Sequence, residues 1–394
     1  MSKKFQNHSE RAHAVLSASG ASRWLNCTPS AKMSEGIQEE ASPHAEEGTL
    51  AHELSENILR WKLGLISEQE FNAKTMELRR HPMYTTDIEY EVQPYVEIAL
   101  EQIAEAKGMT QDALILIEER VSLEVYIEDS FGTCDLIIIC DGLMIVIDLK
   151  FGKGVRVSAV DNSQLKLYAV GAVEKYSMLY DINTVRLMIV QPRLDAVSVW
   201  DIEASDLLQW AEDHVKPKAA LAYAGEGEHT PGDWCRFCKA KVFCPALKKE
   251  AVALAEKDFK PEELTEDQTD GLLEVFEIAD RVNNYLEAVK DHIYKLALEG
   301  RKFPGYKLVE GRSMRKITDE SKAMDILQGA GYIEDDYLNK IVKLKGLGDL
   351  EKRLGKANMD KYLGAVIVKP AGKPALVPES DKRPELRSAD DFLD

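Results

Sequence analysis

The sequence predicts an α/β protein with a helical N-terminal region and a mainly helical C-terminal domain. The main observation is a change of pattern near Ala113. Amphipathic helical stretches occur before it, around 45–63 and 92–106, and five runs rich in β-branched residues follow it. We expect these runs to be strands, at 114–123, 133–140, 143–150, 184–192 and 196–203. A helical pattern at 158–176 separates the third run from the fourth, which is typical of a sheet covered by helices.

The chain divides into three parts by composition. We expect a first domain at 1–257, with a helical insertion at about 57–112 and a Gly/Pro-rich cysteine loop after a helix at 204–224. A mainly helical domain follows at 258–368. It begins with a long amphipathic helix at 267–298, whose apolar residues recur at spacings of one, three or four. Residues 369–394 carry four prolines among charges and are expected to form a disordered tail.

Charge and composition limit the class of protein. The chain has 394 residues, of which 45% are hydrophobic and 30% charged, as in soluble globular proteins. The net charge of −18 means that a polyanion must bind at a local basic patch. Residues 150–175 hold five basic against two acidic side chains, and residues 235–250 hold five against one. The sequence lacks an apolar run of membrane-spanning length, a signal-peptide core and a phosphate-binding loop, so we expect a cytoplasmic protein without a nucleotide-driven motor.

The most informative segment is the hairpin at 133–150. Its two apolar strands are joined by the Asp-Gly pair at 141–142, the preferred pair for a two-residue type I′ turn. This turn places Asp135 directly across from Asp148, with Cβ atoms about 5 Å apart. The period of two places Lys150 on the same face as Asp148. Two carboxylates and one amine are therefore expected together at one end of an apolar sheet.

This predicted cluster has a functional and a purely structural interpretation. Facing carboxylates repel each other unless they share a proton or hold a cation, and hard oxygen ligands suit Mg²⁺ or Mn²⁺. The adjacent lysine could activate water or stabilise charge on a phosphate. The alternative is a surface salt bridge between Asp148 and Lys150 on an edge hairpin. Because both faces of the two strands are apolar, we expect interior strands and favour the functional interpretation.

Two further pairs have helical spacing beside this hairpin. Gln164 and Tyr168 lie four residues apart, directly after the acidic hairpin, and are candidates for positioning a substrate backbone. His52 and Glu56 lie four apart at the start of an upstream helix. A single histidine is usually structural, but imidazole is a good additional ligand for Mn²⁺ beside carboxylates.

The cysteines form a second candidate site. Three of them make a C-x2-C-x5-C loop, a soft-ligand pattern that lacks its fourth member: Cys235, Cys238 and Cys244. Cys134 and Cys140 lie in apolar strands, so Cys27 is the best remaining candidate. Four thiolates could hold Zn²⁺ or an iron–sulfur cluster, and the spacing does not choose between them. Such a site would join the two ends of the first domain.

Four motifs in order resemble those of the RecB-like branch of the PD-(D/E)XK nuclease superfamily. They are G-T-x-x-H-x3-E at 48–56, G-T-x-D at 132–135, D-x-K at 148–150 and Q-x3-Y at 164–168. One cysteine before the histidine motif and three after Q-x3-Y resemble the iron–sulfur subset that includes the AddB nuclease and the CRISPR-adaptation exonucleases. The match covers roughly residues 20–247. The whole chain also resembles an uncharacterised family carried by bacteriophages and prophages.

The resemblance implies a restriction-endonuclease-like mixed central sheet and a set of residue roles. The metal, Mg²⁺ or Mn²⁺, would be held by His52, Asp135, Asp148 and the carbonyl of Leu149. Lys150 would act on the attacking water, and Gln164 and Tyr168 would orient Lys150 or the DNA backbone. Glu118 or Glu119 would be auxiliary. The resemblance also implies a 4Fe–4S cluster, with structural zinc as the alternative, on Cys27, Cys235, Cys238 and Cys244.

The expected activity is therefore metal-dependent DNA exonuclease activity in phage replication or recombination, within the cytoplasm of a bacterial host. DNA is the expected partner, together with a phage or host replication or recombination protein. An oligomer that encircles DNA, or a separate helicase, would be needed for processivity. A non-catalytic DNA-end-binding adaptor with a structural iron–sulfur cluster is the main alternative, and a cysteine-cluster redox protein is a third.

Overall fold

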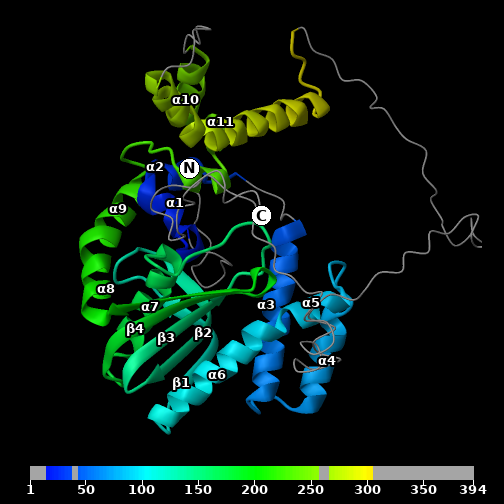
Figure 1. The fold of residues 1–394 in the computed structure, drawn as a ribbon, viewed down its shortest axis with the longest axis vertical. Coiled ribbons are helices and arrows are strands. Elements are labelled where there is room, and N and C mark those ends of the chain that lie inside the picture. The colour runs from blue at the N-terminus through cyan, green and yellow to red at the C-terminus, as the bar shows by residue number, and fades with distance from the viewer. Residues whose placement is uncertain (1–14, 38–42, 257–265, 305–394) are drawn as a thin grey trace, which may run out of the picture. The chain divides into compact units, whose positions relative to one another are not determined.

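The computed structural model describes residues 15–37, 43–256 and 266–304. Its centre is a five-stranded sheet in the order β1-β2-β3-β4-β5 (Figure 1). The strands are β1 (Leu114–Ser122), β2 (Phe131–Cys140), β3 (Gly142–Leu149), β4 (Ile182–Gln191) and β5 (Ala196–Glu203). Strands β3 and β4 run parallel and the other neighbours antiparallel, so the predicted α/β fold with a mixed central sheet is confirmed.

The hairpin of β2 and β3 has the predicted register but a different turn. Cys140 pairs with Leu143 and Leu136 with Ile147, so Asp135 and Asp148 occupy the next facing positions. Within the described chain, a type I′ turn would need positive φ at both central residues, and only Gly142 has it, at +75°. The turn instead bonds to the segment before β4, since the Gly142 N–H donates a hydrogen bond to the Asp181 carbonyl. The prediction of a type I′ turn was wrong, although its register was right.

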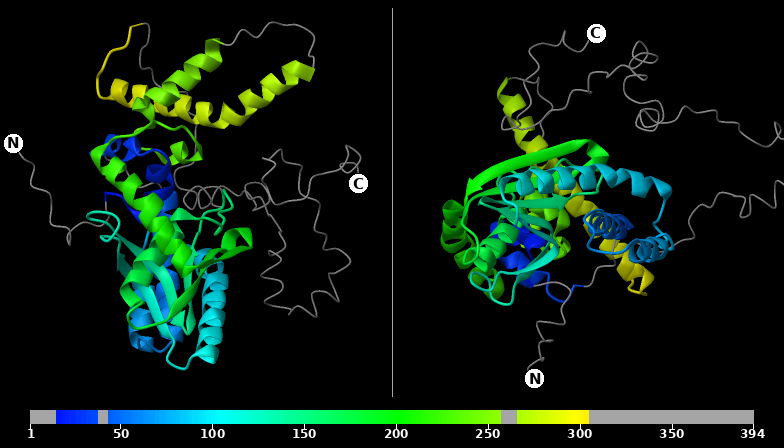
Figure 2. Two further views of the ribbon diagram at one scale, coloured as in Figure 1. Left: turned by 90° about the vertical axis from the view of Figure 1, so that its left-hand side faces the viewer. Right: turned by 90° about the horizontal axis from the view of Figure 1, so that it is seen from below.

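Helices precede the sheet, as the sequence predicts. The first part of the chain forms the short 3₁₀ turn η2 (Ala18–Gly20) and helices α1 (Ala21–Asn26), α2 (Pro29–Met33), α3 (Pro43–Lys62), α4 (Glu68–Leu78), α5 (Thr86–Glu91) and α6 (Gln93–Met109). Helix α4 begins at a capping box. The Ser67 hydroxyl accepts a hydrogen bond from the Glu70 N–H, and the Glu70 carboxylate accepts one from the Ser67 N–H. Helices α3 to α5 gather beside the sheet (Figures 1 and 2).

The sheet is buried on both faces. Helix α7 (Ser163–Tyr176) contacts strands β1 to β4 on one face, in a core that also includes the buried Trp24 of α1. Helices α6 and α3 cover the other face, where Tyr95 and Leu59 pack on residues of β2 and β3. Strands β2 and β3 are therefore interior strands, as their two apolar faces predict.

Helix α7 begins later than its apolar pattern indicates. The predicted pattern starts at 158, but the helix starts at Ser163, because the Asn162 side chain accepts hydrogen bonds from the N–H groups of Gln164 and Leu165. Residues 158–161 instead form part of the connection from β3. The cap places Gln164 in the first turn of α7, facing the end of the acidic hairpin.

The remaining described elements all follow β4 in the sequence. They are η3 (Pro192–Leu194), α8 (Ala204–Trp210), the π-turn η4 (Ala211–Val215), α9 (Lys216–Ala224), η5 (Asp233–Phe237), η6 (Lys241–Phe243), α10 (Pro245–Glu256) and α11 (Glu266–Leu298). Helix α11 confirms the predicted long helix, and Gly300 follows it with φ of +95°. Contacts group Met1–Leu308 into one unit, and the predicted tail at 369–394 lies outside the described residues. The predicted domain boundaries stay predictions.

Candidate metal and catalytic site

The acidic hairpin holds its two carboxylates at the same end of the sheet. Asp135 Oδ2 accepts a hydrogen bond of 2.6 Å from the Leu149 N–H, so this side chain closes the end of the hairpin. Asp148 is only 2% exposed. Burial raises the pKa of Asp148, against the opposing effect of Lys150. Leu149 thus contacts the site through its N–H, whereas the predicted role of its carbonyl stays a prediction.

Four of the predicted residues form one contact network around Asp148. Lys150 Nζ lies 2.8 Å from Asp148 Oδ2 and donates to Gln164 Oε1 at 3.0 Å. Gln164 Nε2 donates to Asp148 Oδ1 at 3.1 Å and to the Tyr168 hydroxyl at 2.9 Å. The amide of Gln164 therefore fixes the amine and the carboxylate at once. Burial alone would lower the pKa of Lys150, but the Asp148 charge raises it, so the amine stays protonated at neutral pH.

Gly132 allows Tyr168 to reach this network. A Cβ atom on Gly132 would lie 2.5 and 2.8 Å from Cε1 and Cδ1 of the Tyr168 ring, which is closer than real contacts permit. The ring thus packs directly on the Gly132 backbone. The glycine of the G-T-x-D motif is required here by close approach and not by its φ angle.

Two further ligand-type side chains lie beside Asp135. His52 of α3, Glu118 of β1 and Asp135 offer donor atoms that all lie within 4.8 Å of one another. His52 Nδ1 lies 3.2 Å from Asp135 Oδ1. Glu118 is the position opposite Asp135 in the β1–β2 register and has φ of +53°, a conformation that non-glycine residues rarely adopt and that strained functional sites often contain.

Two of these groups, Glu118 and His52, have raised pKa values. Burial and the neighbouring Asp135 raise the pKa of Glu118 to about 7. Burial would lower the pKa of His52, but the charge and hydrogen bond of Asp135 raise it to about 9. Glu118 and His52 therefore hold protons more tightly than free side chains do. A divalent cation bound here would displace these protons, since metal binding releases protons from its ligands.

The donor chemistry and the space both fit a small divalent cation. Asp148 Oδ2 is buried and accepts no hydrogen bond among the described residues, although Lys150 faces it as an ion pair. A cavity of about 10 Å³ lies between His52, Glu118, Asp135 and the buried Tyr95, which is room for one water-sized occupant. Carboxylate oxygens and one imidazole suit Mn²⁺ or Mg²⁺.

Other predicted positions differ in their surroundings. Glu119 points away from the site and bonds to Lys175 and Tyr176, so of the two predicted acids Glu118 is the one near the predicted ligands. Glu56 accepts a hydrogen bond from Arg60 at 2.7 Å. The basic patch at 150–175 is smaller than its composition indicates, because most of its lysines pair with carboxylates.

The reason is visible at Lys166, which is 4% exposed. Its Nζ lies 2.6 Å from Asp161 and 3.7 Å from the centre of the Trp210 ring. Lys153, Arg156 and Lys175 are exposed, but Lys153 lies 3.6 Å from Glu91 and Lys175 pairs with Glu119. The count of charges along the sequence could not distinguish these surface cations from the buried amines.

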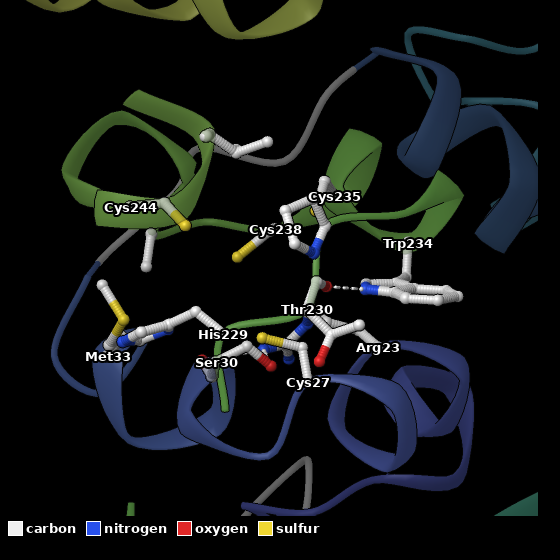
Figure 3. Close-up of a pocket in the computed structure, with 13 residues that line it drawn as sticks. Arg23, Cys27, Ser30, Met33, His229, Thr230, Trp234, Cys235, Cys238 and Cys244 are labelled. Atoms are coloured by element: carbon white, nitrogen blue, oxygen red, sulfur yellow. Dashed lines mark hydrogen bonds between the residues drawn. The ribbon is translucent and has the colours of Figure 1, made fainter. Parts of the chain in front are cut away.

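The four predicted cluster cysteines line one cavity. Cys27, which caps the end of α1, lies opposite Cys235, Cys238 and Cys244 from the loop around η5 and η6 (Figure 3). A hydrogen bond of 2.5 Å from the Thr28 hydroxyl to the Glu226 carbonyl joins the two segments, which are 198 residues apart. The expectation that Cys27 is the fourth member is thus consistent with its place, while Cys134 and Cys140 are fully buried in β2.

His229 is a residue of this cavity that the sequence analysis missed. Its side chain lines the cavity with the cysteines, and its buried Nδ1 has no hydrogen-bond partner among the described residues (Figure 3). An unpaired buried nitrogen beside four thiols is what a bound metal group would satisfy. The signal available in the sequence was a histidine six residues before Cys235.

The fold and the two sites define a mixed α/β protein with a candidate cation site at the end of a hairpin and a separate cysteine cavity. The chain belongs to the family described as protein of unknown function (DUF2800), whose model matches residues 13–384. Within the described residues, no helix has the length and hydropathy needed to cross a membrane.

Two solved structures show distant similarity. One, from Eubacterium rectale and named "Putative exonuclease", is 12% identical over 69% of this chain and 98% of that chain, with a TM-score of 0.34. The other, named SSO0001, is 12% identical over 57% of this chain and 96% of that chain, with a TM-score of 0.22. Similarity at these TM-scores carries no argument about activity.

Proposed function

We propose that this protein is a metal-dependent deoxyribonuclease, and specifically an exonuclease that serves phage replication or recombination. The observation that carries the proposal is the convergence of side chains from five separate elements on the end of one hairpin. Helix α3 supplies His52, β1 supplies Glu118, β2 supplies Asp135, the end of β3 supplies Asp148 and Lys150, and α7 supplies Gln164 and Tyr168. A structural ion pair alone would need only Asp148 and Lys150.

The chain's own groups have distinct roles in this proposal. His52, Glu118 and Asp135 hold the cation, and Asp148, whose Oδ2 also faces Lys150 at 2.8 Å, adds a carboxylate oxygen. The bound Mg²⁺ or Mn²⁺ supplies Lewis acidity and a lowered pKa of water for phosphodiester hydrolysis.

Lys150, Gln164 and Tyr168 orient the attacking water and stabilise the charge that develops on the phosphate. Lys150 is held in one orientation by the Gln164 amide and directs its protonated amine toward the reacting phosphate or water. Gln164 is in turn fixed by the Tyr168 hydroxyl, so these two residues orient Lys150. These roles follow those that the resemblance implies, except that Glu118 becomes a cation ligand in place of an auxiliary acid and the Leu149 carbonyl is left out.

DNA is the proposed substrate because exposed cations flank the site. Lys153 and Arg156 follow the D-x-K motif, and the cysteine loop and α10 add five more, at Arg236, Lys239, Lys241, Lys248 and Lys249. Contacts from these residues to phosphates would supply most of the affinity and make it strongly salt-dependent. A phage or host replication or recombination protein is the proposed protein partner.

We also propose a 4Fe–4S cluster on the four cysteines. The preference for this cluster over zinc rests on the resemblance to the iron–sulfur nucleases, and the common cavity that the four cysteines line supports a shared ligand.

The test is cleavage of end-labelled single- and double-stranded DNA by anaerobically purified protein, with Mn²⁺ or with EDTA. Asp148→Asn and Lys150→Met should each abolish degradation. Asp201→Asn is the matched control, because it breaks a bidentate Arg186–Asp201 pair on the exposed side of β4 and β5 and should leave degradation unchanged. Tight DNA binding without cleavage under any metal would reject the nuclease and favour the non-catalytic end-binding adaptor.

A further inference from the structure

Arg193, which follows the end of β4, lies at the centre of a buried charge cluster. Its side chain is 6% exposed. The guanidinium donates two hydrogen bonds to Glu47, of 2.8 and 2.6 Å, and one of 2.7 Å to Glu91. Its plane lies over the Phe151 ring, with the Cζ atom 3.8 Å from the ring centre. Arginine suits this place because its planar fork binds carboxylates bidentately and stacks on aromatic rings.

The partners of Arg193 belong to three segments, two of which also carry residues of the proposed cation site. Glu47 lies on α3, five residues before His52, and Glu91 is the last residue of α5. Phe151 directly follows Lys150, whose N–H is bonded to the Val190 carbonyl of β4. One guanidinium therefore joins the end of the sheet, the strand end that carries Lys150 and the helix that carries His52.

The same contact is reinforced by packing. Phe151 is buried in a small core with Leu50, Ala51 and Leu54 of α3. These residues surround His52 along the helix, so α3 rests on Phe151 while Arg193 holds its first turns. The apolar contact resists separation of α3 from the sheet, whereas it resists rotation of the helix only weakly, because dispersion contacts are not directional.

We infer that Arg193 is a positioning residue that sets the rotation of α3 and thereby the place of His52 opposite Asp135. This inference rests on the proposed role of His52 as a metal ligand. Five residues of α-helix separate Glu47 from His52 by about 7.5 Å along the axis and about 140° around it. A fixed Glu47 therefore defines where the imidazole points.

A small loss of this restraint is enough to affect a metal ligand. An imidazole about 6 Å from the helix axis moves by about 1 Å when the helix rotates by about 10°. Ligand groups must be held to within about 0.5 Å and 10–20° of their working geometry. Removal of the Arg193 fork should therefore weaken metal binding even where α3 remains folded.

The test measures Mn²⁺ affinity of the metal-stripped full chain by the loss of the free-ion signal in electron paramagnetic resonance. Arg193→Met should raise the dissociation constant about tenfold to hundredfold, as loss of a residue that orients a ligand typically does. Arg193→Lys, which cannot form the bidentate pair, should give a smaller increase. Glu47→Gln, whose side chain is more exposed, gives a second route to the same loss if Arg193→Met does not fold.

The matched control is Arg79→Met, which breaks a comparable bidentate pair between Arg79 and Glu89. It should change the Mn²⁺ dissociation constant less than twofold. A double variant provides the decisive comparison, because Arg193→Met should add almost nothing once His52→Ala has removed the ligand.

The outcomes separate this inference from the proposed function. Wild-type protein that does not bind Mn²⁺ would overturn both. Two results would overturn the positioning role alone. One is equal Mn²⁺ affinity of the wild-type protein and of folded Arg193→Met. The other is an effect of Arg193→Met that persists fully in the His52→Ala background. An affinity loss confined to the Arg193 and Glu47 variants, and absent without His52, is the expected result.

Discussion

The two glycines of the paired G-T motifs should respond to alanine with opposite signs. At Gly132 a Cβ atom would lie 2.5 Å from a carbon of the Tyr168 ring, so the ring must move by about 1 Å to reach ordinary contact. Such overpacking costs about 1–3 kcal/mol, and the shift lengthens the 2.9 Å bond between the Tyr168 hydroxyl and Gln164. Gly132→Ala should therefore lower both the stability and the activity of the protein.

Gly48 gives the matched control on the same residue change. It lies inside α3, and nothing lies within 4 Å of the position that its Cβ would take. Alanine in a helix interior is favoured over glycine by about 0.5–1 kcal/mol, so Gly48→Ala should stabilise the protein. Thermal unfolding followed by circular dichroism should show a Tm about 2–12 °C lower for Gly132→Ala and about 1–4 °C higher for Gly48→Ala. Shifts of the same sign would refute the assignment of close approach at Gly132.

Three further outcomes follow from the same structure. Mn²⁺ binding should tighten about tenfold for each pH unit between 7 and 9, because the metal displaces the proton of His52, whose pKa is about 9. Below pH 7 the affinity should depend on pH more steeply, because Glu118 is then also protonated. Affinity that does not change with pH in calorimetric titrations would contradict this. Gln191→Leu should speed hydrogen exchange at 152–160, because the Gln191 side chain bonds to the backbone at Val155 and Val157. Cys27→Ser should lower the iron content and expose residues 15–37 to proteolysis, and unchanged iron would reject Cys27 as a ligand.

The sequence predicted most of the fold because its patterns are local. Each of the five strands is rich in β-branched residues, and α3, α6 and α11 carry apolar residues at helical spacing. The register of the β2–β3 hairpin also followed from the two-residue connection, which pairs Cys140 with Leu143 and so sets every later pair. The turn type did not follow, because its backbone is bonded to a segment 39 residues further along the chain.

The sequence alone determined the candidate residues, namely the facing Asp135 and Asp148, the neighbouring Lys150 and the separated cysteines. Only the tertiary structure decided which other side chains reach them. Glu118 and not Glu119 faces the candidate site because the β1–β2 register places Glu118 opposite Asp135, and Arg193 joins α3 to the sheet although no local pattern marks it. Local periodicity fixes strands and helices, whereas contacts between residues more than a hundred positions apart depend on how those elements pack.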